Sequence, residues 1–249
     1  MKYRYCAATE KGLHAHNKDS VFVNGKTLYH GFKSGTADDG FYAVICDGVG
    51  GEIGGEIASR LATESFRRII PEQTNVLTIN KHLYGLNENI CRMQKAIPEV
   101  KNMSTTVAGL LMNEDYYTVF NVGDTRVYQY SNGNLVKLSK DHTLAQFRYD
   151  WNEIDSVSEA SSEEKSMLTR FIGGNELISK PYVRCGRTNG YGDIVIICSD
   201  GVYKTVNENI IKKVLELDIE LDKKEQAILL HAKKNGSDDA SLILIERIA

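Results

Sequence analysis

The sequence predicts an α+β fold in which helices pack on layered antiparallel sheets. Three observations support this prediction. Short apolar runs that end at polar turns follow one another closely, as the strands of antiparallel meanders do. Two blocks with the three-and-four spacing of amphipathic helices precede the central run of strands. Two more helical blocks near the end are followed by a last strand.

The predicted elements can be placed along the chain. The clearest strands are residues 41–46, 105–112, 116–122, 126–130, 193–198 and 241–246. The first helix carries an apolar stripe that includes Ile57, Leu61 and Phe66, and the second is predicted over 76–96, with its inner face formed by Leu83, Leu86, Ile90, Met93 and Ile97. Residues 207–216 and 222–234 are the later helices. Because the turns between central strands are short, these strands are expected to pair antiparallel.

The stretch from 139 to 190 differs in composition. Ser and Glu dominate residues 156–166, the single Trp151 lies just before them, and glycines are frequent after residue 172. Insertions of this kind lie on the surface and supply lids and substrate contacts.

Composition excludes several classes of protein. The 249 residues can bury a large core without disulfides or a structural metal. The balance of 30 Lys plus Arg against 33 Asp plus Glu argues against a basic nucleic-acid binder. No apolar run approaches the roughly 20 residues of a membrane helix, and residues 1–10 contain no apolar run typical of a signal peptide. We therefore expect a cytoplasmic protein without nucleic-acid or membrane partners.

The five cysteines are scattered and form no Cys-x-x-Cys pair, which argues against a disulfide framework or a zinc ribbon.

The glycine-rich turn after the strand at 41–46 was tested first as a phosphate-binding loop. It lacks the third glycine of the dinucleotide pattern, and Glu56 and Ile57 stand where a P-loop has Lys and Ser or Thr. What the turn does supply is the carboxylate of Asp47 at a strand end, followed by Gly48, which allows the chain to bend. Divalent cations prefer such oxygen ligands.

Four other acidic residues occupy similar turns at strand ends: Asp19, Asp124, Asp200 and Asp238, the last followed by Asp239. An Asp-Gly pair after a strand is most often an ordinary turn. Two interpretations therefore stay open. The turns either converge on one end of a sandwich and form a carboxylate metal cluster, or they are separate solvated turns.

Seven segments, in chain order, resemble the motifs of the metal-dependent protein phosphatases, the type 2C Ser/Thr phosphatases, in a compact bacterial form. They are Asn17-Lys-Asp19, Asp47-Gly-Val-Gly-Gly51, Ser104-Thr-Thr106, Val122-Gly-Asp124-Thr-Arg126, Lys140-Asp-His142, Cys198-Ser-Asp-Gly201 and Asp238-Asp-Ala-Ser241. Each match alone is weak, but seven in order over nearly the whole chain are specific.

The resemblance implies a four-layer α/β/β/α sandwich of two antiparallel sheets flanked by antiparallel helix pairs. It implies one catalytic domain over residues 1–249, with a flap at about 140–190. The implied activity is hydrolysis of phosphoserine and phosphothreonine in proteins by a water held between two Mn²⁺ or Mg²⁺ ions. The expected partners are phosphoproteins, including a bacterial Ser/Thr kinase whose action the enzyme reverses, and the expected state is a monomer.

The resemblance also assigns roles to residues. Asp47 is the bridge between the two ions, and Gly48 gives its carbonyl. Asp200 and Asp238 complete the ligands of the first ion, whereas Asp19 holds water molecules bound to the second ion. Asp124 is the candidate ligand of a third ion.

Three positions depart from the family pattern. Lys18 replaces a glutamate, Val49 stands where some relatives have a histidine, and His14 stands where relatives have an arginine that holds the substrate phosphate. A protonated His14 would still contact phosphate, with a charge that depends on pH. Lys18 and His14 motivate an alternative, a catalytically weak family member that acts as a regulatory binding module. A second alternative is a phosphatase of one dedicated partner in bacterial stress signalling.

Overall fold

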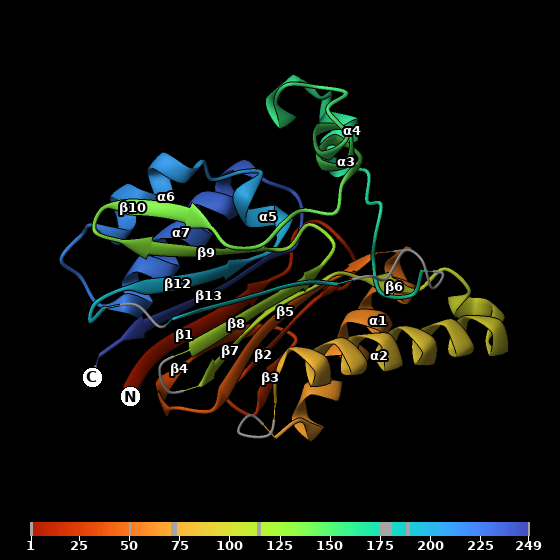
Figure 1. Ribbon diagram of the computed structural model, residues 1–249, viewed down its shortest axis with the longest axis horizontal. Helices are drawn as coiled ribbons and strands as arrows, with labels where there is room; N and C mark the ends of the chain where they lie inside the picture. The colour runs from red at the N-terminus through yellow and green to blue at the C-terminus, as the bar shows by residue number, and fades with distance from the viewer. Residues whose placement is uncertain are drawn as a thin grey trace.

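Two antiparallel sheets lie face to face in the computed structural model, and helices cover the outer surface of each sheet (Figure 1). The structure describes residues 2–49, 51–70, 74–113, 116–174, 181–187 and 190–248, so Gly50 of the glycine-rich turn lies outside the described residues. The layers follow the order helix, sheet, sheet, helix. The predicted α+β fold with four layers is thereby confirmed.

One sheet has six strands in the order β10-β9-β12-β13-β1-β4. In that order their bounds are Asn134–Lys137, Arg126–Ser131, Ile194–Cys198, Ala240–Arg247, Lys2–Glu10 and Gly31–Asp38. Strands β1 and β13 pair in its interior, with Cys6 opposite Leu244. This pairing places the start and the end of the described chain side by side.

The other sheet has seven strands, six of them in the order β11-β8-β7-β5-β2-β3, with β6 paired to β5 beside this path. The bounds are Tyr182–Arg187, Tyr116–Val122, Val107–Asn113, Phe41–Val49, Asp19–Val23 and Lys26–Leu28, and Ser104–Thr105 for β6. Strand β5 lies near the centre of this sheet. Its end carries the glycine-rich turn to the edge of the sandwich.

Both faces of each sheet are covered, which explains the unbroken apolar run of β5. Successive side chains of a strand point to opposite faces. Phe41, Ala43 and Ile45 therefore enter the core between the sheets, whereas Val44 and Cys46 enter the core beneath the helices of that sheet. A strand that is buried on both faces shows no alternation of apolar and polar residues.

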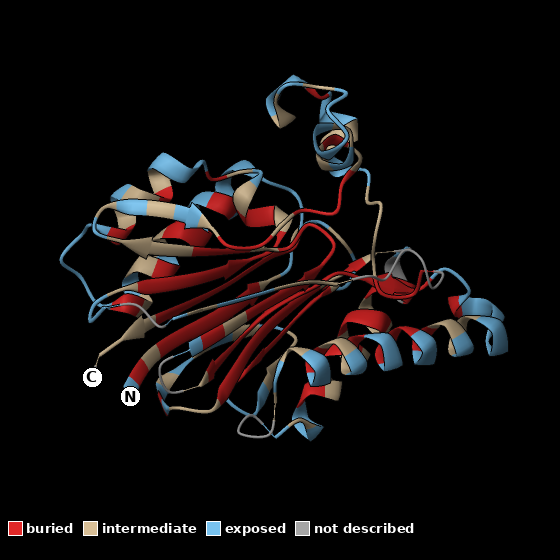
Figure 2. Cartoon of the chain, viewed as in Figure 1, coloured by how far each residue is buried: buried red, intermediate tan, exposed pale blue. Residues whose placement is uncertain are grey.

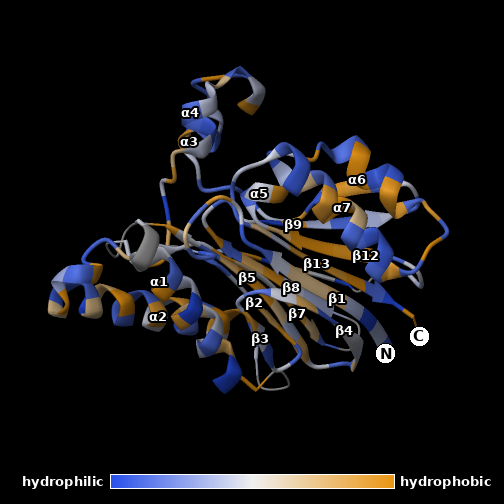
Figure 3. Cartoon of the chain, turned by 180° about the vertical axis from the view of Figure 1, so that it is seen from behind, coloured by the Kyte–Doolittle hydropathy of each residue, from blue (hydrophilic) through white to orange (hydrophobic). Residues whose placement is uncertain are grey.

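Two sets of helices form the outer layers. On the seven-stranded sheet lie α1 (Glu52–Ser65), η1 (Phe66–Arg68), α2 (Val76–Ala96) and η3 (Pro98–Val100). On the six-stranded sheet lie α5 (Asp200–Tyr203), α6 (Glu208–Leu215) and α7 (Leu221–Asn235). Figure 2 shows the buried residues concentrated in the strands and on the helix faces that meet them. From behind, the strands are largely hydrophobic and the helices are mixed (Figure 3).

The second helix has the bounds that its apolar spacing predicted, 76–96. It begins after Asn75, whose side chain accepts hydrogen bonds from the backbone N–H groups of Leu77 and Thr78. Ile97, expected on the inner face, is 40% exposed, because the chain leaves the helix there.

The segment from 140 to 190 divides into two parts. The helices α3 (Leu144–Asp150) and α4 (Ser162–Ser166), with η4 (Val157–Glu159) between them, project from the sandwich (Figure 1). Strand β11, by contrast, belongs to the seven-stranded sheet, where it pairs with β8. Among the described residues, no helix combines the length and the hydropathy that a bilayer span requires.

Candidate metal-binding active site

Four of the predicted acidic residues line one cleft, where β5 ends and α5 begins. Asp47 lies near the end of β5, Asp124 in the turn between β8 and β9, Asp200 at the first residue of α5 and Asp238 just before β13. Gly48 also lines this cleft, which has a volume of about 500 Å³. The structure therefore brings together turns that lie far apart in the sequence, as the first interpretation of these turns required.

Asp19 lies beside this group on the neighbouring strand. It pairs with Asp47 across β2 and β5, so both side chains leave the same face of the sheet. Burial raises the pKa of Asp19 to about 8, although the hydroxyls of Ser199 and Ser241 act in the opposite direction. Its Oδ2 atom is buried and has no hydrogen-bond partner among the described residues. A buried oxygen of this kind is costly unless a cation or a water bound to a cation satisfies it.

The other carboxylates also repel one another. Burial, followed by the charges of Asp19, Asp200, Asp124 and Asp238, raises the pKa of Asp47 well above its ordinary value. Burial and the charge of Asp200 raise the pKa of Asp124 to about 6. Carboxylates that disfavour their own ionisation in this way are stabilised by a positive charge placed between them.

The donor set fits a hard divalent cation. The candidate ligands are carboxylate and backbone oxygens, and the described residues that line the cleft include no histidine and no cysteine. Oxygen ligands of this type suit Mg²⁺ and Mn²⁺, whereas zinc sites usually contain nitrogen or sulfur ligands. Together with the unpartnered Oδ2 of Asp19, this chemistry shows that the residues present fit the divalent ions implied by the family motifs.

The position of Asp47 is fixed by the segment that follows η3. The backbone N–H of Thr106 and the hydroxyl of Thr105 donate to the carbonyl of Asp47, at 2.8 and 2.9 Å. The backbone N–H of Asp47 in turn donates to Oγ1 of Thr106, at 3.1 Å. The Ser-Thr-Thr motif therefore holds the main chain of Asp47 and leaves its carboxylate directed to the cleft.

Gly48 permits a close approach between the end of β5 and the start of α1. A Cβ atom at this position would lie 2.2 Å from the carbonyl oxygen of Gly55 and 2.7 Å from that of Lys18. Both obstacles are backbone atoms, which cannot rotate away as a side chain does. Only glycine fits here, and the sharp turn beside the carboxylates depends on it.

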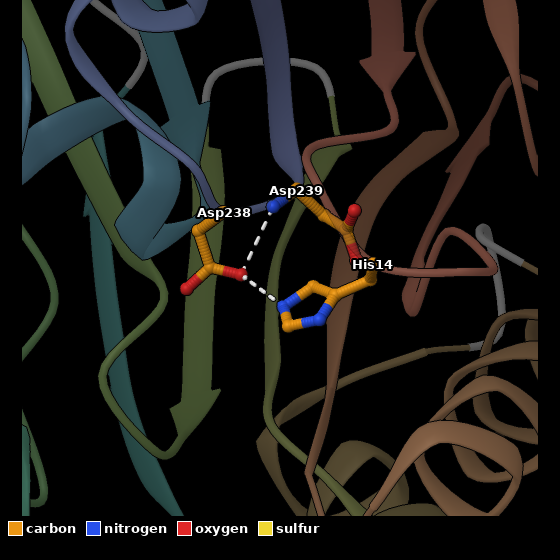
Figure 4. Close-up of side chains that lie close together, drawn as sticks. All are labelled: His14, Asp238 and Asp239. Carbon is orange, nitrogen blue, oxygen red and sulfur yellow. Dashed lines mark hydrogen bonds and ion pairs between the residues drawn. The ribbon is translucent and has the colours of Figure 1, made fainter.

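Asp238 and Asp239 have different roles (Figure 4). Both oxygens of Asp239 accept backbone N–H groups, from Gly12 and from Lys18, each at 2.8 Å. Asp238, by contrast, is exposed, and its Oδ1 contacts the backbone N–H of Asp239 and Nε2 of His14, at 2.9 and 3.2 Å. Asp239 thus joins three segments of the chain, and Asp238 is the one that reaches the cleft.

The structure places His14 beside a candidate metal ligand. Its ring lies against the carboxylate of Asp238 (Figure 4), and His14 is not among the described residues that line the cleft. The geometry thus gives it a contact to a candidate ligand. A direct contact between His14 and the substrate stays a prediction.

The motif analysis gave no role to two neighbouring residues of α5. The ammonium of Lys204 contacts Oδ2 of Asp200 at 2.6 Å, and the hydroxyl of Tyr203 donates to Oδ2 of Asp124 at 2.9 Å. Burial acts to lower the pKa of Lys204, but the charge and hydrogen bond of Asp200, together with the charges of Asp124 and Asp47, outweigh it and raise the pKa. The spacing of four residues between Asp200 and Lys204 was the available signal, because such pairs meet on one helix face.

A buried ion pair supports the base of the projecting segment. Arg126 donates to both carboxylate oxygens of Asp141, and its guanidinium lies 3.6 Å from the centre of the Tyr203 ring. The neighbouring His142 is buried, its Nδ1 accepts the backbone N–H of Gly123, and burial lowers its pKa to about 4. These contacts give His142 a structural role beside the turn that carries Asp124.

The end of α4 and the residues that follow it also reach the cleft. Ser166, Leu168 and Phe171 form part of its wall. The position of these residues agrees with the substrate-contact role expected for this insertion.

The comparisons with known proteins agree with this fold and show the family. A model of the family described as Protein phosphatase 2C matches residues 29–217, which is most of the chain. The chain belongs to this family. The serine/threonine protein phosphatase PstP of Mycobacterium tuberculosis is 24% identical over 247 residues, covering 98% of this chain. The match covers only 45% of PstP, so the chain spans about half the length of that relative.

Another relative matches over nearly all of its length, and a solved catalytic domain shares the fold. The serine/threonine phosphatase stp of Listeria welshimeri is 26% identical over 251 residues, which cover 96% of this chain and 94% of the relative. The crystal structure of the catalytic domain of PstP in complex with two manganese ions superposes with a TM-score of 0.80 at 22% identity, over 100% of both chains. At this identity the superposition shows a shared fold.

Proposed function

We propose that this protein phosphatase 2C member hydrolyses phosphoserine and phosphothreonine in proteins with the help of two Mn²⁺ or Mg²⁺ ions. The observation that carries the proposal is the cleft where Asp47, Asp124, Asp200 and Asp238 meet, with the unpartnered oxygen of Asp19 beside them. The manganese named for the PstP structure and the phosphatase names of the relatives support the same proposal.

The residues that would hold the ions follow from the cleft. Asp47 would bridge them, and the Gly48 carbonyl, Asp200 and Asp238 would complete the ligands contributed by the chain. Asp19 lies deeper and would hold waters bound to the second ion. Asp124 remains the candidate for a third.

When bound, such ions lower the pKa of a shared water and neutralise charge on the phosphoryl group. The chain's own contribution is to hold the ligands in place beforehand. Thr105 and Thr106 fix the main chain of Asp47, and the backbone contacts of Asp239 fix the segment that carries Asp238. Because these contacts exist without substrate, little reorganisation is needed when the phosphate enters.

Further parts of the proposal concern the cellular setting and the whole chain. We propose phosphoprotein substrates, including those of a Ser/Thr kinase that the enzyme opposes, a monomeric state and a cytoplasmic location. We also propose that residues 1–249 act as one catalytic domain, in which the segment at about 140–190 supplies the flap. The Ser166, Leu168 and Phe171 contacts to the cleft support this role of the flap.

The test is phosphate release from a phosphothreonine peptide with Mn²⁺, with Mg²⁺, and after removal of metal by a chelator. We expect turnover with either ion and none after chelation. Asp47→Asn should reduce turnover by a factor of about 10³ or more, since it removes the bridging charge. Asp38→Asn, which changes an exposed carboxylate in β4, is the matched control and should keep the wild-type rate.

Near-normal turnover of Asp47→Asn would show that the bridging assignment is wrong. A protein that binds Mn²⁺ but turns over neither peptides nor a candidate partner would instead be the regulatory binding module that Lys18 and His14 suggested. Activity on one phosphoprotein only, with none on peptides, would identify a dedicated phosphatase.

A further inference from the structure

The two carboxylates on the α5 side of the cleft already have partners from the chain itself. Lys204 holds Oδ2 of Asp200 at 2.6 Å, and Tyr203 holds Oδ2 of Asp124 at 2.9 Å. The two partners are consecutive in the chain. Tyr203 is the last residue of α5, and Lys204 follows it. On this side, one oxygen of each carboxylate therefore has a partner that the chain itself supplies.

The Lys204 ammonium is part of the cleft rather than of the outer surface. Lys204 lines the same cavity as Asp47, Asp124 and Asp200, and its side chain is 38% exposed. An ion pair on an open surface contributes little, but one at the wall of a narrow acidic cleft places its positive charge among several carboxylates. Lys204 thereby supplies a fixed positive charge to the Asp124–Asp200 side.

The position of Tyr203 is equally restricted. Its ring lies against the guanidinium of Arg126, 3.6 Å away, and Arg126 is held in turn by both oxygens of Asp141. The Tyr203 hydroxyl is thus directed at Asp124, which is only 4% exposed. Because Asp124 is buried and Tyr203 is itself held by Arg126, this hydrogen bond restricts the orientation of the Asp124 carboxylate.

We infer that Lys204 and Tyr203 take the place of a third divalent ion at the Asp124–Asp200 side, so that the cleft holds two ions and the Lys204 ammonium serves as its third cation. The inference rests on the proposed two-ion function and specifies how many ions this chain binds. It opposes the expectation that Asp124 ligates a third ion. A divalent ion placed between Asp124 and Asp200 would meet the ammonium at close range, and like charges at such distances repel strongly.

The test is the number of Mn²⁺ ions bound by the full chain, measured by equilibrium dialysis with Mn²⁺ alone and metal analysis of the protein. The wild-type protein should bind two ions over a titration to millimolar Mn²⁺. Lys204→Met should bind a third, with an affinity at least about 10-fold higher than any third ion in the wild type. Lys204→Arg, which keeps the charge, should again bind two.

Lys18→Met is the matched control. Lys18 also lines the cleft, but among the described contacts it forms no ion pair with a candidate ligand. It should leave the count at two. Asp124→Asn added to Lys204→Met should remove the third ion. Far-UV circular dichroism of each variant establishes that it is folded before its ions are counted.

Three results would overturn the inference: a wild-type protein that binds three ions, a folded Lys204→Met that still binds two, or a third ion gained equally by Lys18→Met. Each of these leaves the proposed function intact. A wild-type protein that binds no Mn²⁺ would contradict the proposed function itself, and with it the inference.

Discussion

Two regions of this molecule bury carboxylates, and they differ in what surrounds them. At the cleft, Asp19 and Asp47 lie close to further carboxylates, and Asp47 lines the cavity. On the opposite outer layer, Glu225 of α7 is completely buried, and neither of its carboxyl oxygens has a hydrogen-bond partner among the described residues. Burial, with a smaller contribution from Asp222, raises the pKa of Glu225 to about 8.

Burial is the largest cause of the raised pKa in both regions, but the consequences differ. Glu225 belongs to α7, which packs on β1 and β13 beside an apolar cluster. Protonation is the simplest way to avoid a buried, unpaired charge on the Glu225 carboxyl group. The cleft carboxylates share a cavity in which a divalent ion can replace the protons. A perturbed pKa therefore indicates a metal site only where several ligands and an entry path coincide.

The largest expected effect is the response of stability to metal. Mn²⁺ at about 100 times its dissociation constant should stabilise the protein by about 3 kcal/mol for one ion, which raises the melting temperature by about 5 to 10 °C. The response should be larger at pH 8 than at pH 5, because protons compete for carboxylates whose pKa is raised. Thermal denaturation with Mn²⁺ or chelator at both pH values measures it.

Glu225 should be unaffected by that titration. A melting temperature that does not change with Mn²⁺ at pH 8 would contradict the metal assignment of the cleft. If Glu225→Gln abolished the Mn²⁺ response, the two regions would not be independent.

A smaller effect is expected from Glu225 itself. Its carboxyl group binds a proton more tightly in the folded state, so the stability it contributes is complete below its unfolded pKa and is lost as pH rises through about 8. The metal-free protein should therefore lose stability between pH 5 and pH 8. Glu225→Gln should reduce this loss by about 2 kcal/mol, measured by urea denaturation at both pH values.

Glu88→Gln, a change at an exposed position of α2, is the control for that measurement and should leave the pH dependence as it is. An unaltered pH dependence in Glu225→Gln would mean that Glu225 ionises without cost, contrary to its complete burial.

The smallest expected effect concerns His14. Removing its contact to Asp238 in His14→Ala should weaken activity by a factor of about 5, which corresponds to about 1 kcal/mol for one hydrogen bond. If His14 contacts substrate phosphate, the loss should appear in KM for a phosphopeptide. His231→Ala, at an exposed position of α7, is the control.

A loss confined to Mn²⁺ affinity would instead assign His14 to the positioning of Asp238. Full activity and unchanged Mn²⁺ affinity would show that neither role exists.

Local patterns predicted most of the elements. The spacing of apolar residues placed α2 at 76–96, and the strand over 116–122 has the bounds of β8. Strands β1 and β4 were not identified from their own residues. In β1, Tyr3, Tyr5 and Ala7 face one core while Cys6 faces another, so both sets of alternate positions carry apolar or small residues and the expected alternation is weak.

The candidate ligands were chosen from the sequence, because Asp at a strand end beside glycine is a local feature. The sequence could not show which Asp of the pair 238–239 is held by backbone N–H groups and which reaches the cleft. That depends on the N–H groups of Gly12 and Lys18, which reach Asp239 from the other end of the chain. Nor could it show that Glu225, in an amphipathic helix, would be completely buried.

The sequence by itself determined the family, the order of elements and the acidic turns, since all of these are encoded by residues close together in the chain. Only the tertiary structure decided which carboxylates share a cavity and which groups stand between them. The contacts of Lys204 with Asp200 and of Tyr203 with Asp124 illustrate the difference. The first joins residues one helical turn apart, whereas the second requires the β8–β9 turn to meet α5. Charges interact through space, so the number of ions a site can hold is set by distances that only the folded chain defines.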